Sequence, residues 1–510
     1  MASRTGPFDL EEATIANLQR RIETGEDTAR SLTEKYLARI DAIDRAGPAL
    51  RSVIEINPDA VATAERLDTE RSRHGPRGPL HGIPILIKDN IATADRMMTT
   101  SGSLALVGSK PPSDAFIIDR LRQAGTIVLG KSNLSEWAEF RSQHCCAGWS
   151  GRGGQTRNPY ALDRSPMGSS AGSAVAVAAN LCAVALGTET DGSIVLPANN
   201  NSVVGLKPTV GLASRHGIVP ISRSQDTPGV LARTVTDAAL VLATMAGPDG
   251  ADAATHARDR PDLHRMITFA RRGLRGARIG VVRSQLFGNS VAADRAAEAA
   301  LAVMKREGAI LIDPANITTL WRFDDTELDA LAYEFKAGLE AYLKWIGPGA
   351  RVRSVRDVIA FNIAHQAAEL PYFGQELLTL AQEKGPLTSP RYRAAIAKNR
   401  RLSRTLGIDA VLEKHRLDAL VAPTGPPPAL TDLVNGDGGT WAVSSPATVA
   451  AVAGYPHLSV PMGFSRGLPM GISFFGTAWS EPTLIKLAFA FEQATKHRRL
   501  PTFAPSAHLT

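Results

Sequence analysis

Apolar residues follow two different patterns along this chain. Between residues 8 and 70 they recur at steps of three and four, as Leu32, Tyr36, Ile40 and Ile43 do, which predicts helices with one buried stripe. Later, short aliphatic runs bounded by glycine, proline or polar residues predict strands. These runs are PLHGIPILIKDNI (79–91), TIVLG (126–130), CAVALG (182–187), RIGVV (278–282), AILI (309–312), ALVAP (419–423) and HLSVPMG (457–463).

Helical patterns separate most of these predicted strands. Such alternation predicts an α/β fold, with a large mixed or largely parallel sheet covered by helices on both faces. From 320 to 418 the strand signal lapses, and stretches such as ELDALAYEFKAGLEAYLKWI are helical in pattern. Because strand patterns resume beyond this segment, we predict one domain over 1–510. Its parts are an N-terminal helical segment (8–70), a core (75–310), a mainly helical insertion (320–418) and a return to the core (419–510).

Charge and hydropathy exclude several classes of protein. The chain has 57 basic and 50 acidic residues, and its densest basic patch, RRGLRGAR (271–278), contains no aromatic residue, so we expect no nucleic-acid partner. The longest apolar stretch, 174–187, is interrupted by Asn180 and is shorter than the roughly twenty residues that cross a bilayer. The N-terminus has no hydrophobic signal region. We therefore expect no membrane association and a cytoplasmic location, or a periplasmic or secreted one if a leader has been removed.

Cysteine usage gives no sign of a metal or a disulfide framework. The chain has three cysteines, Cys145, Cys146 and Cys182, and neither a C-x-x-C pair nor a His/Cys cluster with zinc spacing accompanies them. We expect no metal and no cofactor, and a buried, free Cys182.

Candidate chemistry gathers in GSSAGSAVAVAANLCAVALGTETDGSI (168–194), which holds four serines near glycines. The G-x-S-x-G pattern would make Ser170 the nucleophile of an α/β-hydrolase, but that elbow must follow a strand. Here it follows TRNPYALDRSPM, which contains two prolines. A Ser-x-x-Lys pair is absent, because no lysine of the chain has a serine three residues before it. The remaining possibility is a base that is a lysine distant in sequence.

Lys88 is the best candidate for that base. It follows the branched aliphatic residues of GIPILIKDN, at the end of a predicted strand. An exposed lysine has a pKa of about 10.4 and cannot accept a proton at neutral pH, whereas burial can lower that value by several units. The alternative is a lysine that simply ends a strand and reaches solvent.

The motifs around these residues resemble those of the amidase signature enzymes. The resemblance rests on GSSAGSAVAVAANLCAVALGTETDGSIVLPANNNSVVGLKPTVG, PLHGIPILIKDNI, GTIVLGKSNLSEWA and GYPHLSVPMG, and extends over nearly the whole chain, with the signature region at 150–235. It implies that Ser193 is the nucleophile, that Ser169 is an intermediate serine preceded by a cis peptide at Gly168, and that Lys88 is the base. Acyl transfer through Ser193 would follow, without a cofactor.

The loop before Ser193 suits a developing oxyanion. Backbone N–H groups of Thr190, Asp191, Gly192 and Ser193 can turn toward the oxygen of a tetrahedral intermediate, where losing one such donor typically costs about 10² to 10³ in rate. Hydroxyls of Thr188 and Thr190 could support this loop. Ser170 and Ser173 are expected to cap the helix that follows Ser169.

Within the family, the motifs TETDGSIV, GWSGRGGQTRNPY and LSEWAEF are most similar to bacterial peptide amidases, which remove the C-terminal amide of peptides. This implies a peptide or small-molecule amide substrate. The predicted substrate-binding residues are Gly168, Asp191, Glu139, Phe140 and Trp149. Aryl amides, anilides or carbamates remain alternative substrates, and the alternative functions are a non-catalytic binding protein and a component of a transamidation complex. We expect a monomer or a small homo-oligomer, and a structural role for His81.

Overall fold

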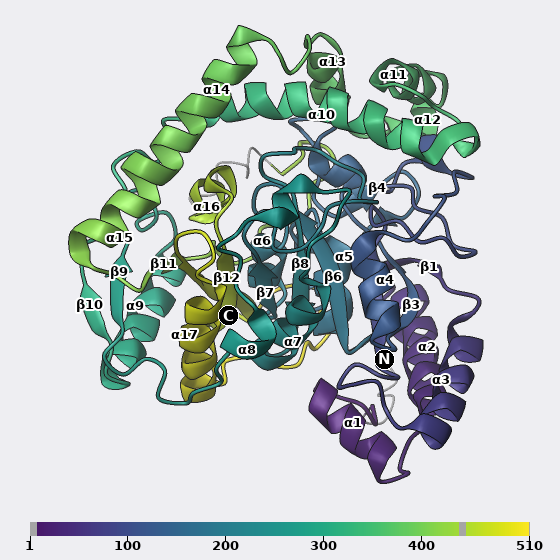
Figure 1. The fold of residues 1–510 in the computed structure, drawn as a ribbon, viewed down its shortest axis with the longest axis horizontal. Coiled ribbons are helices and arrows are strands. Elements are labelled where there is room, and N and C mark those ends of the chain that lie inside the picture. The colour runs from purple at the N-terminus through teal and green to yellow at the C-terminus, as the bar shows by residue number, and fades with distance from the viewer. Residues whose placement is uncertain (1–7, 438–444, 509–510) are drawn as a thin grey trace.

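One large mixed sheet organises the molecule (Figure 1). The computed structural model describes residues 8–437 and 445–508. Within these residues eleven strands pair in the order β1-β3-β2-β6-β8-β7-β12-β13-β11-β9-β10. Their bounds are β1 (Val53–Ile56), β2 (Pro84–Lys88), β3 (Ile127–Ser132), β6 (Val184–Glu189), β7 (Val204–Lys207), β8 (Thr227–Ala232), β9 (Arg278–Val281), β10 (Ile310–Ile312), β11 (Ala419–Pro423), β12 (His457–Ser465) and β13 (Leu468–Phe475). A separate hairpin joins β4 (Trp149–Ser150) and β5 (Gly154–Gln155).

The α/β architecture expected from the sequence is confirmed, with one correction near the N-terminus. The segment 8–70 is not helical throughout, because β1 interrupts it and pairs antiparallel with β3 at the edge of the sheet. Including β1, four strands of the sheet lie outside the predicted runs, and the other three are β7, β8 and β13. Proline or glycine within β8 (TPGVLA) and β13 (LPMGISFF) obscured their strand pattern.

Helices cover the faces of the sheet, and the neighbouring strands β3, β2, β6, β8 and β7 are buried along their whole length. The helices whose apolar residues join the clusters around the sheet are α1 (Ile15–Glu23), α2 (Ala29–Arg39), α3 (Ala60–His74), α4 (Phe116–Gln123), α5 (Ala171–Ala178), α6 (Val195–Asn200), α7 (Val235–Met245), α9 (Val291–Arg306), α16 (Ala447–Ala453) and α17 (Glu481–Thr495). A short helix, α8 (Leu263–Met266), lies between α7 and β9. No helix of the described ranges is long and apolar enough to cross a bilayer.

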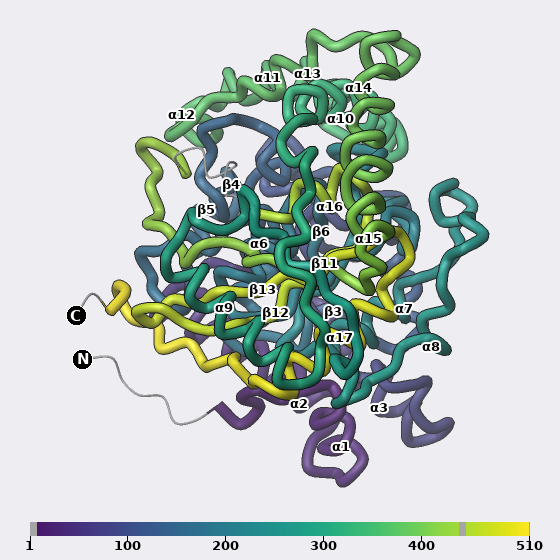
Figure 2. The backbone as a smooth tube through the Cα atoms, turned by 90° about the vertical axis from the view of Figure 1, so that its left-hand side faces the viewer, coloured from purple at the N-terminus to yellow at the C-terminus, as the bar shows by residue number. Residues whose placement is uncertain are grey.

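The residues between β10 and β11 form a run of helices. They are α10 (Asp324–Ile346), α11 (Val355–Ala364), α12 (Gln366–Glu369), α13 (Glu376–Gln382), α14 (Pro390–Arg400) and α15 (Asp409–His415). Figures 1 and 2 both show α10, α11, α13 and α14 above the sheet. Apolar residues of α10, including Phe335 and Leu339, form a core of their own with Trp137 and Phe140. This helical segment therefore packs on the part of the chain that follows β3.

The centre of the sheet positions the candidate chemistry. β2 (PILIK) lies between β3 and β6 and is parallel to both, so that a continuous aliphatic run is buried on both faces. Lys88 is the last residue of this strand. The all-buried helix α5 packs on β2, β3, β6 and β8. Its Gly172 approaches so closely that a Cβ there would clash with the backbone oxygens of Ser52 and Asn133, which places the first turn of α5 against the start of β1 and the end of β3.

Candidate active site

The side chain of Lys88 is buried in a polar cage that is assembled from three segments. Its Nζ lies 2.8 Å from Ser169 Oγ, 3.0 Å from Ser170 Oγ and 3.0 Å from Thr188 Oγ1, and it donates to the Thr188 carbonyl at 3.2 Å. Asn90 Nδ2 donates to the same Thr188 hydroxyl.

Burial sets the charge of this amine. It lowers the pKa of Lys88 from 10.5 to about 7, against the opposing effect of the nearby carboxylates of Glu139, Glu189 and Asp226. The four hydrogen-bond partners of Nζ within the described residues are hydroxyls and a carbonyl, and none is a carboxylate. A substantial fraction of the amine is therefore uncharged at neutral pH.

Ser170 has a different position from the one expected. We predicted that its hydroxyl caps α5, but Ser170 Oγ instead accepts from Lys88 and donates to the Thr188 carbonyl at 3.1 Å. Ser173 does not cap the helix either, because its hydroxyl donates to the Leu186 carbonyl at 2.8 Å. Gly187 makes the inward turn of Ser170 possible, since a Cβ at this glycine would lie 2.7 Å from Ser170 Oγ. Tertiary contacts thus outcompete the local capping bond.

The loop that carries Ser193 is held by backbone hydrogen bonds. The Ser193 carbonyl accepts the N–H of Ser170 at 3.1 Å, which ties this loop to the residue next to Ser169. Beneath the loop, Glu189 Oε2 accepts the N–H groups of Ile194 at 2.7 Å and Val195 at 3.1 Å. Burial raises the pKa of Glu189, and Lys207 together with these N–H groups and that of Gly192 opposes the rise. Ser193 itself is 6% exposed.

The peptide between Gly168 and Ser169 is cis, as the resemblance implied. Side chains crowd this peptide, because a Cβ on Gly168 would clash with both Glu139 Oε1 and Ser135 Oγ. Ser135 Oγ in turn donates to Glu139 at 2.7 Å and accepts the N–H of Gly148 at 2.8 Å. Only glycine fits at position 168.

An unusual backbone turn places Glu139 beside this cis peptide. Trp137, Ala138 and Glu139 all have positive φ, of 52°, 53° and 78°, which side-chain-bearing residues rarely adopt in succession. Packing holds the turn, since the Trp137 ring meets Phe335 of α10 edge-on at 6.4 Å between centroids. Burial raises the pKa of Glu139 from 4.5 to about 7, while its bond to Ser135 opposes this.

Three of the predicted substrate-binding residues, Gly168, Glu139 and Asp191, line one small cavity of about 30 Å³. Burial raises the pKa of Asp191 to about 7, and the charge of Glu189 adds to the rise. The other two predicted residues lie in apolar clusters. Phe140 packs against Phe335 with the rings tilted and 4.8 Å between centroids, and Trp149 packs against Phe373. A substrate contact for these two aromatic residues remains a prediction.

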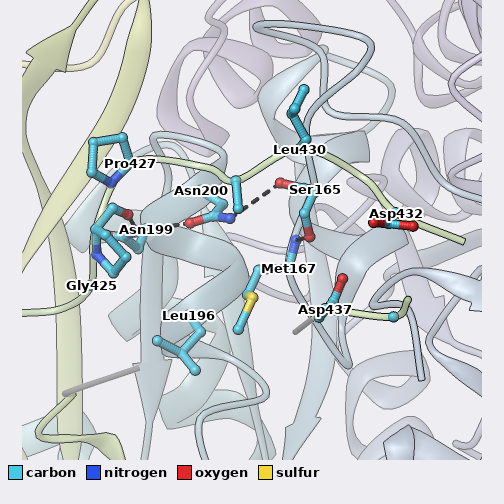
Figure 3. A pocket seen from close by; sticks show the side chains of 13 residues that line it. Ser165, Met167, Leu196, Asn199, Asn200, Gly425, Pro427, Leu430, Asp432 and Asp437 are labelled. Carbon is cyan, nitrogen blue, oxygen red and sulfur yellow. Dashed lines mark hydrogen bonds between the residues drawn. The ribbon is translucent and has the colours of Figure 1, made fainter. Parts of the chain in front are cut away.

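A larger cavity of about 250 Å³ adjoins the first, because Met167, Leu196 and Asp437 line both. Its walls combine residues 165–167, α6 and residues 425–437, and Figure 3 shows Asp432 and Asp437 on the side opposite Asn199 and Pro427. These residues were not among the predicted site residues. Residues 425–437 lie more than 200 residues from the other two segments, so no local pattern could have indicated that the three segments meet.

Other candidate groups lie outside this site. His81 has both ring nitrogens occupied by backbone partners, with Nε2 2.9 Å from the Leu67 carbonyl oxygen and Nδ1 accepting the N–H of Arg77 at 3.2 Å. These contacts agree with the structural role expected for it. In the part of the chain that the structure describes, no three His, Cys, Asp or Glu residues are grouped so that they could hold a metal ion.

The sequence model of the family described as Amidase matches residues 31–485. The native peptide amidase of Stenotrophomonas maltophilia superimposes with a TM-score of 0.92 at 51% identity, covering 98% of this chain and 100% of that one. A probable amidase of Arabidopsis thaliana is 42% identical over 97% of this chain and 92% of its own. An amidase family protein from Bacillus anthracis superimposes with a TM-score of 0.86 at 35% identity, covering 97% of this chain and 93% of that one.

Proposed function

Because this chain belongs to the amidase family and is a hydrolase of amide bonds, we propose that it removes the C-terminal carboxamide of amidated peptides and releases ammonia. The observation that carries this proposal is the buried amine of Lys88 at 2.8 Å from Ser169 Oγ, with a pKa of about 7. Identity of 51% to a peptide amidase supports the choice of substrate class.

The hydrogen bonds around Lys88 favour a lone pair directed at Ser169. An uncharged amine has two N–H donors and one lone pair. The Ser170 hydroxyl donates its hydrogen bond to the Thr188 carbonyl. Toward Nζ, the Ser170 oxygen can therefore only accept a hydrogen bond. The second N–H of Lys88 has the two oxygens of Thr188 as acceptors. The remaining direction, occupied by the lone pair, is free to accept the proton of Ser169.

The proposed reaction is acyl transfer in two halves. Ser193 Oγ attacks the carbonyl carbon while its proton passes to Ser169, whose own proton passes to Lys88. Collapse of the tetrahedral intermediate breaks the C–N bond, and Lys88 returns a proton through Ser169 to the departing nitrogen, which leaves as ammonia. Water then attacks the acyl-enzyme by the same proton route and releases the peptide acid and Ser193.

Backbone N–H groups of the loop 190–193 are the proposed donors to the oxyanion. The N–H of Gly192 interacts with the Glu189 carboxylate, so Thr190, Asp191 and Ser193 are the stronger candidates among the four. By fixing the N–H groups of Ile194 and Val195, Glu189 holds this loop in one shape before substrate arrives.

The deciding experiment is a substrate panel on the purified chain. Ammonia release from N-acyl peptide amides is compared with amine release from matched anilides and carbamates, and Ser193→Ala provides the background. We expect the peptide amides to give the highest kcat/KM. Faster cleavage of anilides or carbamates would assign the alternative substrates, and hydrolysis that needs added partner proteins would favour a role in a transamidation complex.

A further inference from the structure

The charge of the cavities beside the proposed nucleophile indicates which acyl groups they accept. Together the two adjoining cavities are lined by four acidic side chains, Glu139, Asp191, Asp432 and Asp437. Among the residues that the structure describes, none that lines either cavity is a lysine, an arginine or a histidine. We propose that the acyl-side cavity selects amides whose acyl part carries a cationic nitrogen, and rejects amides with an acidic side chain next to the carboxamide.

This inference rests on the proposed function. The size of the larger cavity indicates that it holds the acyl part of the substrate. The leaving group of a primary amide is a single nitrogen atom, which cannot fill about 250 Å³. The peptide part of the substrate must then occupy this space. Met167 and Leu196, which line both cavities, and Leu430 supply apolar surface for the methylene groups of a long basic side chain.

The carboxylates lie close enough to repel one another. The charges of Asp437 and Asp191 both raise the pKa of Glu139, and the charge of Glu189 raises that of Asp191. Asp437 is held in place on this wall because its Oδ2 accepts the N–H of Ala147 at 2.6 Å. A cation on the substrate would relieve this repulsion, whereas a substrate carboxylate would increase it.

Matched isosteric substrates test the proposal. The kcat/KM for N-acetyl-arginine amide is compared with that for N-acetyl-citrulline amide, and N-acetyl-glutamate amide is compared with N-acetyl-glutamine amide. We expect the arginine substrate to exceed citrulline, and glutamine to exceed glutamate, by about tenfold or more. Leucine amide against N-acetyl-leucine amide shows whether a free α-ammonium serves as the cation. Ratios near one in all three pairs, or a preference for glutamate, would overturn the proposal.

Variants assign the effect to this cavity. Asp437→Asn should reduce the arginine-to-citrulline ratio several-fold, whereas Asp41→Asn, the same change at an exposed residue outside both cavities, should not. Because each ratio is measured on one preparation, the fraction of folded enzyme cancels. An unchanged ratio in Asp437→Asn would contradict the assignment.

A second readout separates this inference from the proposed function. If no primary amide is hydrolysed, the proposed function fails. The N-acetyl amides of arginine, citrulline, glutamate and glutamine are then compared for protection of Ser193 from a fluorophosphonate probe. Protection by the arginine amide at about tenfold lower concentration than the citrulline amide would support the charge selectivity, and equal protection would overturn it.

Discussion

Replacing Lys88 with methionine should abolish turnover and remove a pH-dependent cost to stability. The pKa of Lys88 is lowered from 10.5 to about 7 in the fold, so between these values the unfolded chain binds a proton that the folded chain releases. The stability that the neutral amine contributes is therefore fully present above pH 10.5, falls as the pH drops toward about 7, and changes little below that value. Relative to Lys88→Met, the wild-type chain should gain roughly 3 kcal/mol in free energy of unfolding between pH 6 and pH 9.

Urea denaturation of both proteins at pH 6, 7, 8 and 9 measures this difference. Subtracting the two curves cancels the titration of the other groups, and Lys110→Met, which removes an exposed lysine, corrects for the loss of one positive charge. A difference that does not change with pH would show that the amine titrates alike in the folded and unfolded chain. That result would refute the argument for a neutral base.

Three further substitutions probe the surroundings of this amine. Gly168→Ala should lower kcat/KM at least about a hundredfold, because the new Cβ would clash with Glu139 Oε1 and displace the adjoining serine; a loss under threefold would contradict this. Glu139→Gln should move the acidic limb of the pH–rate profile to lower pH, because the Glu139 charge raises the pKa of Lys88. A shift to higher pH would contradict this effect of the Glu139 charge. Ser170→Ala should lower kcat about tenfold with little change in KM, since it removes one acceptor that orients Nζ, and an effect on KM alone would indicate a substrate contact instead.

Much of the site could be predicted because its residues have strong local signals. The run PILIK is aliphatic up to Lys88, and such a run is typical of a central strand buried on both faces, which implies a buried amine. The resemblance of the segment around Ser169 and Ser193 to the amidase signature then indicated the serines expected to act with this amine. The contact of Lys88 with Ser169 agrees with that expectation across 81 positions of sequence.

The residues that sequence analysis missed depend on contacts between distant segments. Capping is the usual local role of a serine at a helix start, but Ser170 is turned inward by the close packing of α5 on the sheet. The backbone turn that carries Glu139 packs on α10 through Trp137, and the sequence of α10 gives no sign of this partner. The strand β1 forms by pairing with the free edge of β3. The helical pattern around residue 53 gave no sign of this pairing.

In the proposed mechanism, an uncharged Lys88 draws the proton of Ser193 through Ser169. The most direct test of this route is the rate at which a fluorophosphonate labels the protein as a function of pH, with the labelled residue identified by peptide mass spectrometry. We expect labelling at Ser193 to rise with an apparent pKa of about 7, and to become slow and independent of that ionisation in Lys88→Ala. Label on another serine, or the same pH dependence in the variant, would contradict the account.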